Sequence, residues 1–252
     1  MQQRTLAFIG AGNMSRSIIA GLIQAGYPAE RIIAANPSRP KLDELASQFG
    51  IRITQDNAEA AREAEVIVLA VKPQLMAGML TALVAELGSL DGKLLISIAA
   101  GIRVARLQEM AGGHDRIIRT MPNTPSLLGL GMTGLYAPPA IGQADRAVAE
   151  QMMQSVGKTL WVDEEAGING VIAAAGSAPA YFFLFMQAIA EEAEAMGFTP
   201  EQARLLVQQT ALGAAAMVEQ NPELSLQTLR EQVTSKGGTT ACLLYTSPSP
   251  RD

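Results

Sequence analysis

Residues 6–15 read LAFIGAGNMS, an apolar run that passes directly into a turn with two glycines. The run 6–9 has the length of a short buried strand, and apolar residues recur at helical spacing from Met14 onward. Gly10 permits a tight turn, and Gly12 lets a pyrophosphate approach the backbone N–H groups at the positive end of the helix. A glycine turn also serves many proteins without a ligand, but its place between a strand and a helix favours dinucleotide binding. The candidate contacts are Gly10, Ala11, Gly12, Asn13 and Met14.

Short apolar runs alternate with helical patterns through residues 6–162. We expect strands at 6–9, 32–35, 66–70, 94–98, 117–118, 132–137 and 159–162. We expect helices at 14–25, 39–49, 57–64, 74–87, 104–110 and 143–155. The strands are apolar throughout rather than alternating, which is typical of a parallel sheet with helices on both faces. The pattern therefore predicts an α/β fold with a Rossmann-type doubly wound sheet.

The pattern changes after Asp163, where apolar residues recur only at helical spacing. We expect helices at 167–175, 178–196 and 200–218. A boundary near Asp163 makes residues 1–163 the dinucleotide-binding domain and residues 164–241 an all-helical domain. Alanine-rich stretches such as 173–175 and 214–216 let helices approach closely, and this domain is too apolar for a self-contained three-helix unit. Burial against a second subunit would account for its composition, and burial against the first domain is the alternative.

Composition excludes several classes of function. The 252 residues are 48% hydrophobic and 17% charged, which is enough apolar surface to bury a core. The net charge is −5, so the chain lacks the excess of basic residues that is typical of nucleic-acid-binding proteins. A single Cys242 and a single His114 leave neither a disulfide framework nor a His/Cys metal cluster. No basic leader with a cleavage site begins the chain, and no apolar run approaches the roughly 20 residues that span a bilayer. We expect a cytoplasmic protein that binds no nucleic acid, membrane or metal.

The residues after the expected strand 32–35 select the cofactor. An NAD site normally carries Asp or Glu there to bond the ribose 2′-hydroxyl, but this chain has Asn36, Ser38 and Arg39. A carboxylate would repel a 2′-phosphate, whereas two neutral polar groups and a cation favour it. NADPH is therefore the expected cofactor, with NADH as the alternative. Ser38 has a second interpretation as the N-cap of the following helix.

Two further strand ends contribute candidates, because ligands bind at the carboxyl ends of strands in open α/β sheets. Ala70, Val71, Lys72 and Pro73 follow the expected strand 66–70. Pro73 fits the first position of a helix, so this segment could simply be a well-started helix, but packing does not explain Lys72. Residues 97–101 are mostly small and leave room for a flat nicotinamide ring, with Ala100 as a candidate contact. A tight loop would also select small residues there.

Five segments taken together resemble the pyrroline-5-carboxylate reductase family. They are residues 10–14, 70–74, 119–125, 176–181 and 233–240, and the likeness runs from the first strand to about residue 241. The resemblance implies a Rossmann domain followed by a helical domain that interlocks with a partner, giving a homodimer or a higher homo-oligomer of dimers. It also implies reduction of a small cyclic imine carboxylate, 1-pyrroline-5-carboxylate, to L-proline by hydride transfer from NADPH, the last step of proline biosynthesis.

The resemblance carries further site residues over by motif. Asn57 would contact NADPH, and the substrate would lie between the nicotinamide of one subunit and the loop 233–240, largely from the other. The implied substrate contacts are Ser235, Gly238, Thr239, Thr240 and Glu219. Thr240 is the first candidate catalytic residue, because its hydroxyl could bond the ring nitrogen and relay a proton; a helix N-cap is its alternative. Lys72 is the second candidate.

The chain departs from the family pattern in three places. Lys236 stands where the family has Pro, and Ala178 where it has Gly, but neither change removes a proposed side-chain donor. The family continues after residue 241 into an amphipathic helix, whereas residues 242–252 include Pro248 and Pro250, which oppose a helix. We expect residues 242–252 to be a foreign or disordered tail.

Two other functions are alternatives. A 3-hydroxyacid dehydrogenase of the related Rossmann-plus-helices type would need a catalytic lysine in its helical domain, and residues 164–231 contain none. A non-catalytic NADPH sensor would have no need of the loop at 235–240.

Overall fold

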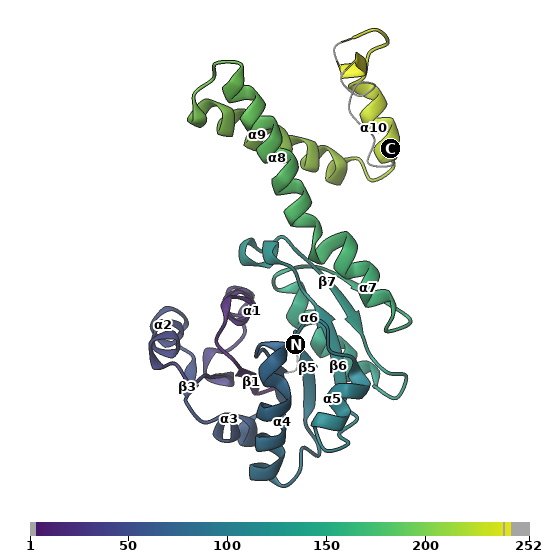
Figure 1. Ribbon diagram of the computed structural model, residues 1–252. Helices are drawn as coiled ribbons and strands as arrows, with labels where there is room; N and C mark the ends of the chain where they lie inside the picture. Colours follow the sequence, from purple (N-terminus) through teal and green to yellow (C-terminus); the bar gives the residue numbers. More distant parts are fainter. Residues whose placement is uncertain (1–3, 239, 243–252) are drawn as a thin grey trace. The chain divides into compact units, whose positions relative to one another are not determined.

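The computed structural model describes residues 4–238 and 240–242. Contacts divide the chain into two compact units, Met1–Pro179 and Ala180–Asp252 (Figure 1). Each unit is described by itself. The first holds the sheet, and the elements of the second that the structure describes are helices.

An eight-stranded sheet forms the centre of the first unit, in the order β3-β2-β1-β4-β5-β6-β7-β8. The strands are β1 (Leu6–Ile9), β2 (Ile32–Ala35), β3 (Arg52–Thr54), β4 (Val66–Leu69), β5 (Leu94–Ser97), β6 (Ile117–Met121), β7 (Gly131–Tyr136) and β8 (Gly157–Trp161). The Rossmann-type sheet is confirmed. The order reverses between β1 and β4, which is the switch point where ligands bind in this architecture.

Two details of the sheet differ from expectation. β3 was not predicted, because Arg52–Thr54 is a three-residue edge strand that is not buried and therefore carries no apolar run. The expectation of an all-parallel sheet is wrong at β7, which runs antiparallel to β6. The chain returns from β6 through the short η2 (Thr124–Leu128), and so short a return joins antiparallel strands, since parallel ones need a longer crossover.

Helices cover both faces of the sheet (Figure 1). They are α1 (Asn13–Gln24), α2 (Arg39–Phe49), α3 (Asn57–Glu63), α4 (Pro73–Leu87), α5 (Val104–Met110) and α6 (Gln143–Gln154), with a short η1 (Ala29–Arg31) before β2. All six helices were predicted. The side chains of β1 alternate between two buried clusters: Leu6 and Phe8 pack with residues of α1, α2 and α6, and Ala7 and Ile9 with residues of α3, α4 and α5. Burial on both faces explains why the strands are apolar throughout.

The last helical segments of the first unit pack on the sheet. α7 (Gly167–Val171) continues through the π-helical η3 (Ile172–Gly176) toward α8 (Ala178–Ala195). A Cβ on Gly134 of β7 would lie 2.8 Å from the methyl groups of Val171, so only glycine lets α7 approach this closely. The buried Arg119 forms an ion pair of 2.9 Å with Glu165, just before α7. Residues 165–179 therefore pack with the sheet, although the domain boundary expected from sequence lies near Asp163.

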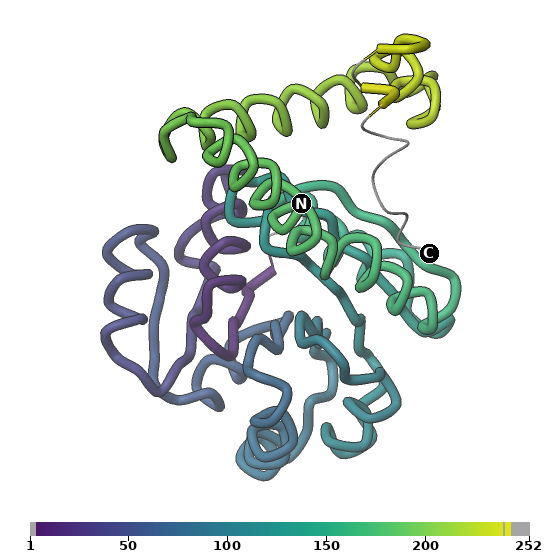
Figure 2. The backbone as a smooth tube through the Cα atoms, turned by 45° about the horizontal axis from the view of Figure 1, so that its top comes forward, coloured from purple at the N-terminus to yellow at the C-terminus, as the bar shows by residue number. Residues whose placement is uncertain are grey.

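The second unit consists of most of α8, α9 (Pro200–Gln220) and α10 (Leu226–Gln232). Figure 2 shows α8 and α9 as long green coils. A capping box at the start of α9 joins Thr199 and Gln202, and the side chain of Ser225 caps α10 by accepting from the N–H of Thr228 at 3.0 Å. The helices expected at 178–196 and 200–218 are confirmed. α10 was not predicted, because its seven residues carry no clear apolar period.

One helical run passes a length and composition test for a membrane span. Gly167–Ala195 is 29 residues long, and its most apolar 18-residue window has a mean hydropathy of 1.5, with 11% of that window buried. The expectation that no apolar stretch approaches the spanning length is therefore wrong, because α7, η3 and α8 join into one helix that the sequence pattern divided at residues 176–178. The core helix of a soluble protein passes the same test, so length and composition alone do not indicate a membrane.

Candidate functional site

The register of the sheet brings the predicted cofactor residues to one edge. Ile9 pairs with Ala35 on one side and with Leu69 on the other, and Leu69 pairs with Ser97. These four residues end four parallel strands. The segments that follow them therefore begin in a row at the carboxyl edge of the sheet.

Gly10 is required by its conformation and by its neighbours. Its φ is +112°, and a Cβ there would lie 2.6 Å from the carbonyl oxygen of Ala70. The Gly10 N–H donates to Ala35 O at 2.8 Å, and the buried Ser15 hydroxyl donates to Gly10 O at 2.6 Å. The turn is thus fastened to the neighbouring strands and to its own helix. The third small-residue position of a dinucleotide-binding motif is normally Gly or Ala. Here it is Ser15, whose hydroxyl forms a hydrogen bond that neither of those residues could form.

The start of α1 is open to an anion. Gly12 is its N-cap in extended conformation, and within the described residues no side chain caps it and no acidic residue lies in its first turn. Apart from the adjacent residues in the chain, no described atom lies within 4 Å of the position that a Cβ on Gly12 would take. Uncapped N–H groups at a positive helix end fit a pyrophosphate, as expected for residues 10–14.

Asn36 links the glycine turn to the start of α2. Its Oδ1 accepts from the Ala11 N–H at 3.2 Å, and its Nδ2 donates to Ser38 O at 3.3 Å. Both hydrogen bonds shape the protein itself, a role that the sequence did not predict. Asn36 therefore positions the residues around a nucleotide whether or not its side chain also contacts one.

The first turn of α2 gathers positive charge. Ser38 stands at the N-cap position, but its hydroxyl forms no capping hydrogen bond to the described residues. Arg39 is the first helical residue, Lys41 follows it, and the first turn carries no acid. A cation near the N-terminus of a helix interacts unfavourably with the helix dipole. A bound anion would offset this unfavourable interaction. The arrangement fits the 2′-phosphate of NADPH.

The end of β4 places Lys72 at another helix start. The Ala70 N–H donates to Ile9 O at 3.0 Å, and the chain then turns into α4 with Lys72 as N-cap and Pro73 at the first helical position. The side chain of Lys72 is exposed. The helix-start interpretation of Pro73 is thus correct, and Lys72 is a second cation at a helix N-terminus.

The turn after β5 is held from beneath by a hydroxyl. Thr120 of β6 is fully buried and donates to Ser97 O at 3.0 Å, while Ser97 Oγ accepts from the Ala99 N–H at 3.3 Å. Ala100 is exposed beyond this support, and Gly101 has a φ of +78°. Residues 119–125 contribute to the family resemblance, but this supporting role of Thr120 was not predicted; a polar residue after Ile117 and Ile118 in a buried strand indicates a specific hydrogen-bond partner.

Asn57 lies beside a cavity on the same unit. It is the first residue of α3, whose N-cap Asp56 accepts from the Ala58 N–H at 2.8 Å. The cavity has a volume of about 340 Å³ and is also lined by Met79 and Glu86 of α4.

The predicted substrate loop belongs to the second unit. The Gly238 N–H donates to Ser235 O at 2.9 Å, and Gly237 has a φ of +74° in the third position of this turn, as a type II turn requires. Residues 240–242 are helical, and the Cys242 N–H donates to Gly238 O at 3.1 Å. Thr240 is exposed on this turn, and Thr239 lies outside the described residues.

Glu219, the more remote substrate candidate, lies in the last turn of α9 and is exposed. The structure thus places the cofactor candidates in the first unit and the substrate candidates in the second. No group of three or more His, Cys, Asp or Glu residues that could hold a metal occurs in the part of the chain that the structure describes.

Comparison with known proteins decides the family. The model "Pyrroline-5-carboxylate reductase dimerisation" matches residues 165–247, and "NADP oxidoreductase coenzyme F420-dependent" matches residues 5–101. A pyrroline-5-carboxylate reductase of Vibrio alginolyticus is 57% identical over 98% of this chain and 90% of its own length. The chain belongs to the pyrroline-5-carboxylate reductase family.

Solved structures of pyrroline-5-carboxylate reductases have the same fold. That of the Coxiella burnetii reductase superposes with a TM-score of 0.90 at 41% identity and covers 97% of this chain and 90% of that one. That of the Plasmodium falciparum reductase, determined with NADP bound, gives 0.84 at 29% identity and covers 98% and 90%. The family predicted from the five motifs is confirmed, and the dimerisation model indicates a homo-oligomer.

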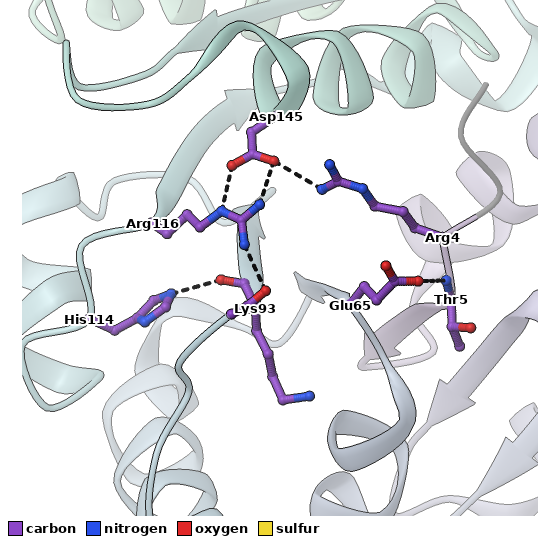
Figure 3. Close-up of polar contacts among 8 residues, drawn as sticks. Arg4, Thr5, Glu65, Lys93, His114, Arg116 and Asp145 are labelled. Carbon is purple, nitrogen blue, oxygen red and sulfur yellow. Dashed lines mark hydrogen bonds and ion pairs between the residues drawn. The ribbon is translucent and has the colours of Figure 1, made fainter.

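A polar network stabilises this reductase chain at the opposite, amino edge of the sheet (Figure 3). Asp145 of α6 is buried and accepts from Arg4, before β1, at 2.9 Å and from Arg116, before β6, at 2.5 and 2.7 Å. Burial by itself would raise the pKa of Asp145, but the hydrogen bonds from Arg116 and Arg4 outweigh it and lower the pKa. The cluster is distant from the carboxyl edge, so we assign it to stability.

Lys93 and His114 extend the same edge (Figure 3). Lys93 Nζ donates to Ala64 O at 2.8 Å, at the end of α3, and Lys93 O lies 3.0 Å from His114 Nε2. Burial lowers the pKa of Lys93, and the nearby Glu65 offsets part of this shift. The ammonium group of Lys93 thus satisfies a carbonyl group at the end of α3, and the His114 ring contacts the Lys93 carbonyl just before β5.

Proposed function

We propose that this chain reduces 1-pyrroline-5-carboxylate to L-proline with a hydride from NADPH, the last step of proline biosynthesis. The observation that carries the proposal is the glycine turn after β1 together with Asn36, Ser38 and Arg39 after β2, none of which is a carboxylate, in a chain of the pyrroline-5-carboxylate reductase family. NADPH, when bound, supplies the hydride. The protein supplies placement and charge.

The cofactor residues hold two anionic parts of the dinucleotide, its pyrophosphate and its 2′-phosphate. The uncapped N–H groups after Gly12 bind the pyrophosphate, and Ser38 and Arg39 bind the 2′-phosphate. Asn57, at the start of α3, and Val71, after β4, are further proposed contacts. The remaining proposed contacts are Gly10, Ala11, Asn13, Met14, Asn36, Ala70, Lys72, Pro73 and Ala100.

The substrate residues hold a carboxylate and a ring nitrogen. In this proposal the backbone of the glycine turn that contains Gly237 and Gly238 binds the carboxylate, with Ser235 and Glu219 as further contacts. The Thr240 hydroxyl bonds the ring nitrogen and helps to relay its proton. A protonated imine already accepts hydride readily, so no stronger acid is needed. Lys72 is the second proposed catalytic residue, through its charge.

The decisive experiment is NADPH oxidation by the full chain with pyrroline-5-carboxylate, with proline measured as product. We expect turnover, and we expect Thr240→Ala to lower kcat/KM more than tenfold, because positioned proton transfer typically contributes about 10²–10⁴-fold to the rate. Thr240→Ser, which keeps the hydroxyl, is the matched control. NADPH binding without turnover would favour the sensor, and an unchanged kcat/KM in Thr240→Ala would remove the role of this hydroxyl.

We also propose that the homo-oligomer is a dimer or an assembly of dimers in the cytoplasm, without nucleic acid or membrane partners. The apolar side chains exposed on α8 and α9 support burial against a second copy. The start of the matched dimerisation model at residue 165 supports a domain boundary near Asp163, with residues 164–241 as the dimerisation domain.

A further inference from the structure

Arg39 has one described partner, the side chain of Asp43 one turn further along α2. Arg39 Nε donates to Asp43 Oδ1 at 2.8 Å. The side chains are 58% and 55% exposed, so the pair lies on the surface, at the start of the helix that follows β2 at the carboxyl edge of the sheet. Among the described residues no acceptor binds the two terminal nitrogens of the Arg39 guanidinium.

The contact with Asp43 uses only Nε of Arg39, so among the described residues the two terminal nitrogens of the guanidinium have no acceptor. A guanidinium has five N–H donors in a planar fork, and phosphate oxygens are bound best by two parallel N–H groups. Asp43 occupies Nε, so the terminal nitrogens keep four N–H donors for a phosphate.

Helix stability does not explain the pair. Arg39 lies at the positive end of α2 and Asp43 lies after it, which is the less favourable order for charges on a helix. Exposed pairs of this kind contribute little to folding. The Arg39–Asp43 ion pair is therefore better explained by a role in binding the cofactor than by a role in stabilising the fold.

We infer that Asp43 is a positioning residue for cofactor specificity, which holds the Arg39 guanidinium ready for the 2′-phosphate of NADPH. The inference rests on the proposed NADPH-dependent function and deepens it. A long arginine side chain loses rotamer freedom when it binds, and a partner that restricts it beforehand reduces this loss. NADH has no 2′-phosphate, so its binding gains nothing from Asp43.

The carboxylate also repels the phosphate, and substitution can separate the two effects. Asp43→Ala removes both the hydrogen-bond acceptor and the charge. Asp43→Asn retains an oxygen that accepts from Nε and removes only the charge. If positioning dominates, the first variant binds NADPH more weakly and the second does not.

The test measures equilibrium binding of NADPH and of NADH to the full chain, by titration without pyrroline-5-carboxylate. We expect Asp43→Ala to raise the Kd for NADPH about two- to fivefold and to leave the Kd for NADH unchanged. Asp43→Asn should bind NADPH no more weakly than the unchanged chain. In an Arg39→Ala background, Asp43→Ala should have no further effect. Glu109→Ala, which breaks the exposed Arg106–Glu109 pair on α5, is the matched control.

Three results would overturn the inference: tighter NADPH binding in Asp43→Ala, an equal loss for NADH, or the same loss in the Arg39→Ala background. Tighter binding would mean that Asp43 competes for Arg39. The binding titration contains no pyrroline-5-carboxylate, so its Kd values test the role of Asp43 and do not depend on turnover. A chain that binds NADPH but fails to turn over would contradict the proposed reaction and leave the role of Asp43 standing.

Discussion

At the scale of single residues, the two glycines of the first turn have different tasks. Gly10 combines a positive φ with a backbone oxygen 2.6 Å from the position of its missing Cβ, so it is required for folding. Gly12 has an ordinary φ of −84° and free space around it, so it is required only where a ligand approaches. A sequence motif treats them alike, but the structure separates them.

Matched substitutions test this difference. We expect Gly10→Ala to lower the free energy of unfolding by about 1–3 kcal/mol, because it combines backbone strain with a clash, and to weaken NADPH binding. We expect Gly12→Ala to change unfolding by less than about 0.5 kcal/mol while still weakening NADPH binding, since the new methyl group meets only the ligand. Urea unfolding and NADPH titration are the measurements. Equal destabilisation by both variants would contradict the distinction.

At the scale of elements, the sheet keeps its polar groups at its two edges for different purposes. At the carboxyl edge, the start of α1 has no side-chain cap, so its N–H groups can bind a ligand. At the amino edge, the polar groups of Arg4, Asp145 and Arg116 bind one another. Asp145 joins α6 to the segments before β1 and β6, which are far apart in sequence. This cluster therefore stabilises tertiary packing rather than any one helix.

The cluster makes stability depend on pH in a defined direction. The pKa of Asp145 is lower in the folded chain than its ordinary value, so its contribution is full above the unfolded pKa, near 4, and is lost as the pH falls through the folded pKa. We expect Asp145→Asn to lower the free energy of unfolding at pH 7 by about 1–3 kcal/mol. The difference from the unchanged chain should shrink below about pH 4.

Denaturant unfolding at pH 7 and at pH 3.5 would measure this dependence. Glu109→Gln, in the exposed pair on α5, is the control and should have little effect at either pH. A difference for Asp145→Asn that stays the same at both pH values would show that the ion pair is not its cause.

At the scale of the whole molecule, α8 exposes a large apolar surface. Five consecutive residues, from Tyr181 to Phe185, are each more than 60% exposed. Five successive positions lie around the full circumference of a helix, and a helix that is apolar on all sides is normally buried. Because the chain matches a dimerisation model here, we expect a second copy of the chain to cover this surface.

A charged substitution on this surface should separate the subunits. We expect Phe185→Glu to reduce the mass measured by light scattering at micromolar concentration to that of one chain, because a buried unpaired carboxylate is costly. Leu160→Glu, at an exposed position of β8, is the control and should leave the mass unchanged. If Phe185→Glu keeps the oligomer intact, α8 does not form the interface.

The sequence by itself determined the alternation of strands and helices, the glycine turn, the choice of NADPH and the family. These are properties of residues close together in the chain, and hydrophobic period, turn chemistry and short motifs report them directly. Only the tertiary structure decided that β7 is antiparallel, that Asn36 supports Ala11, that Thr120 supports Ser97 and that Asp145 joins two arginines. Those contacts pair residues up to 141 positions apart, and their energy depends on geometry after folding, which no local pattern records.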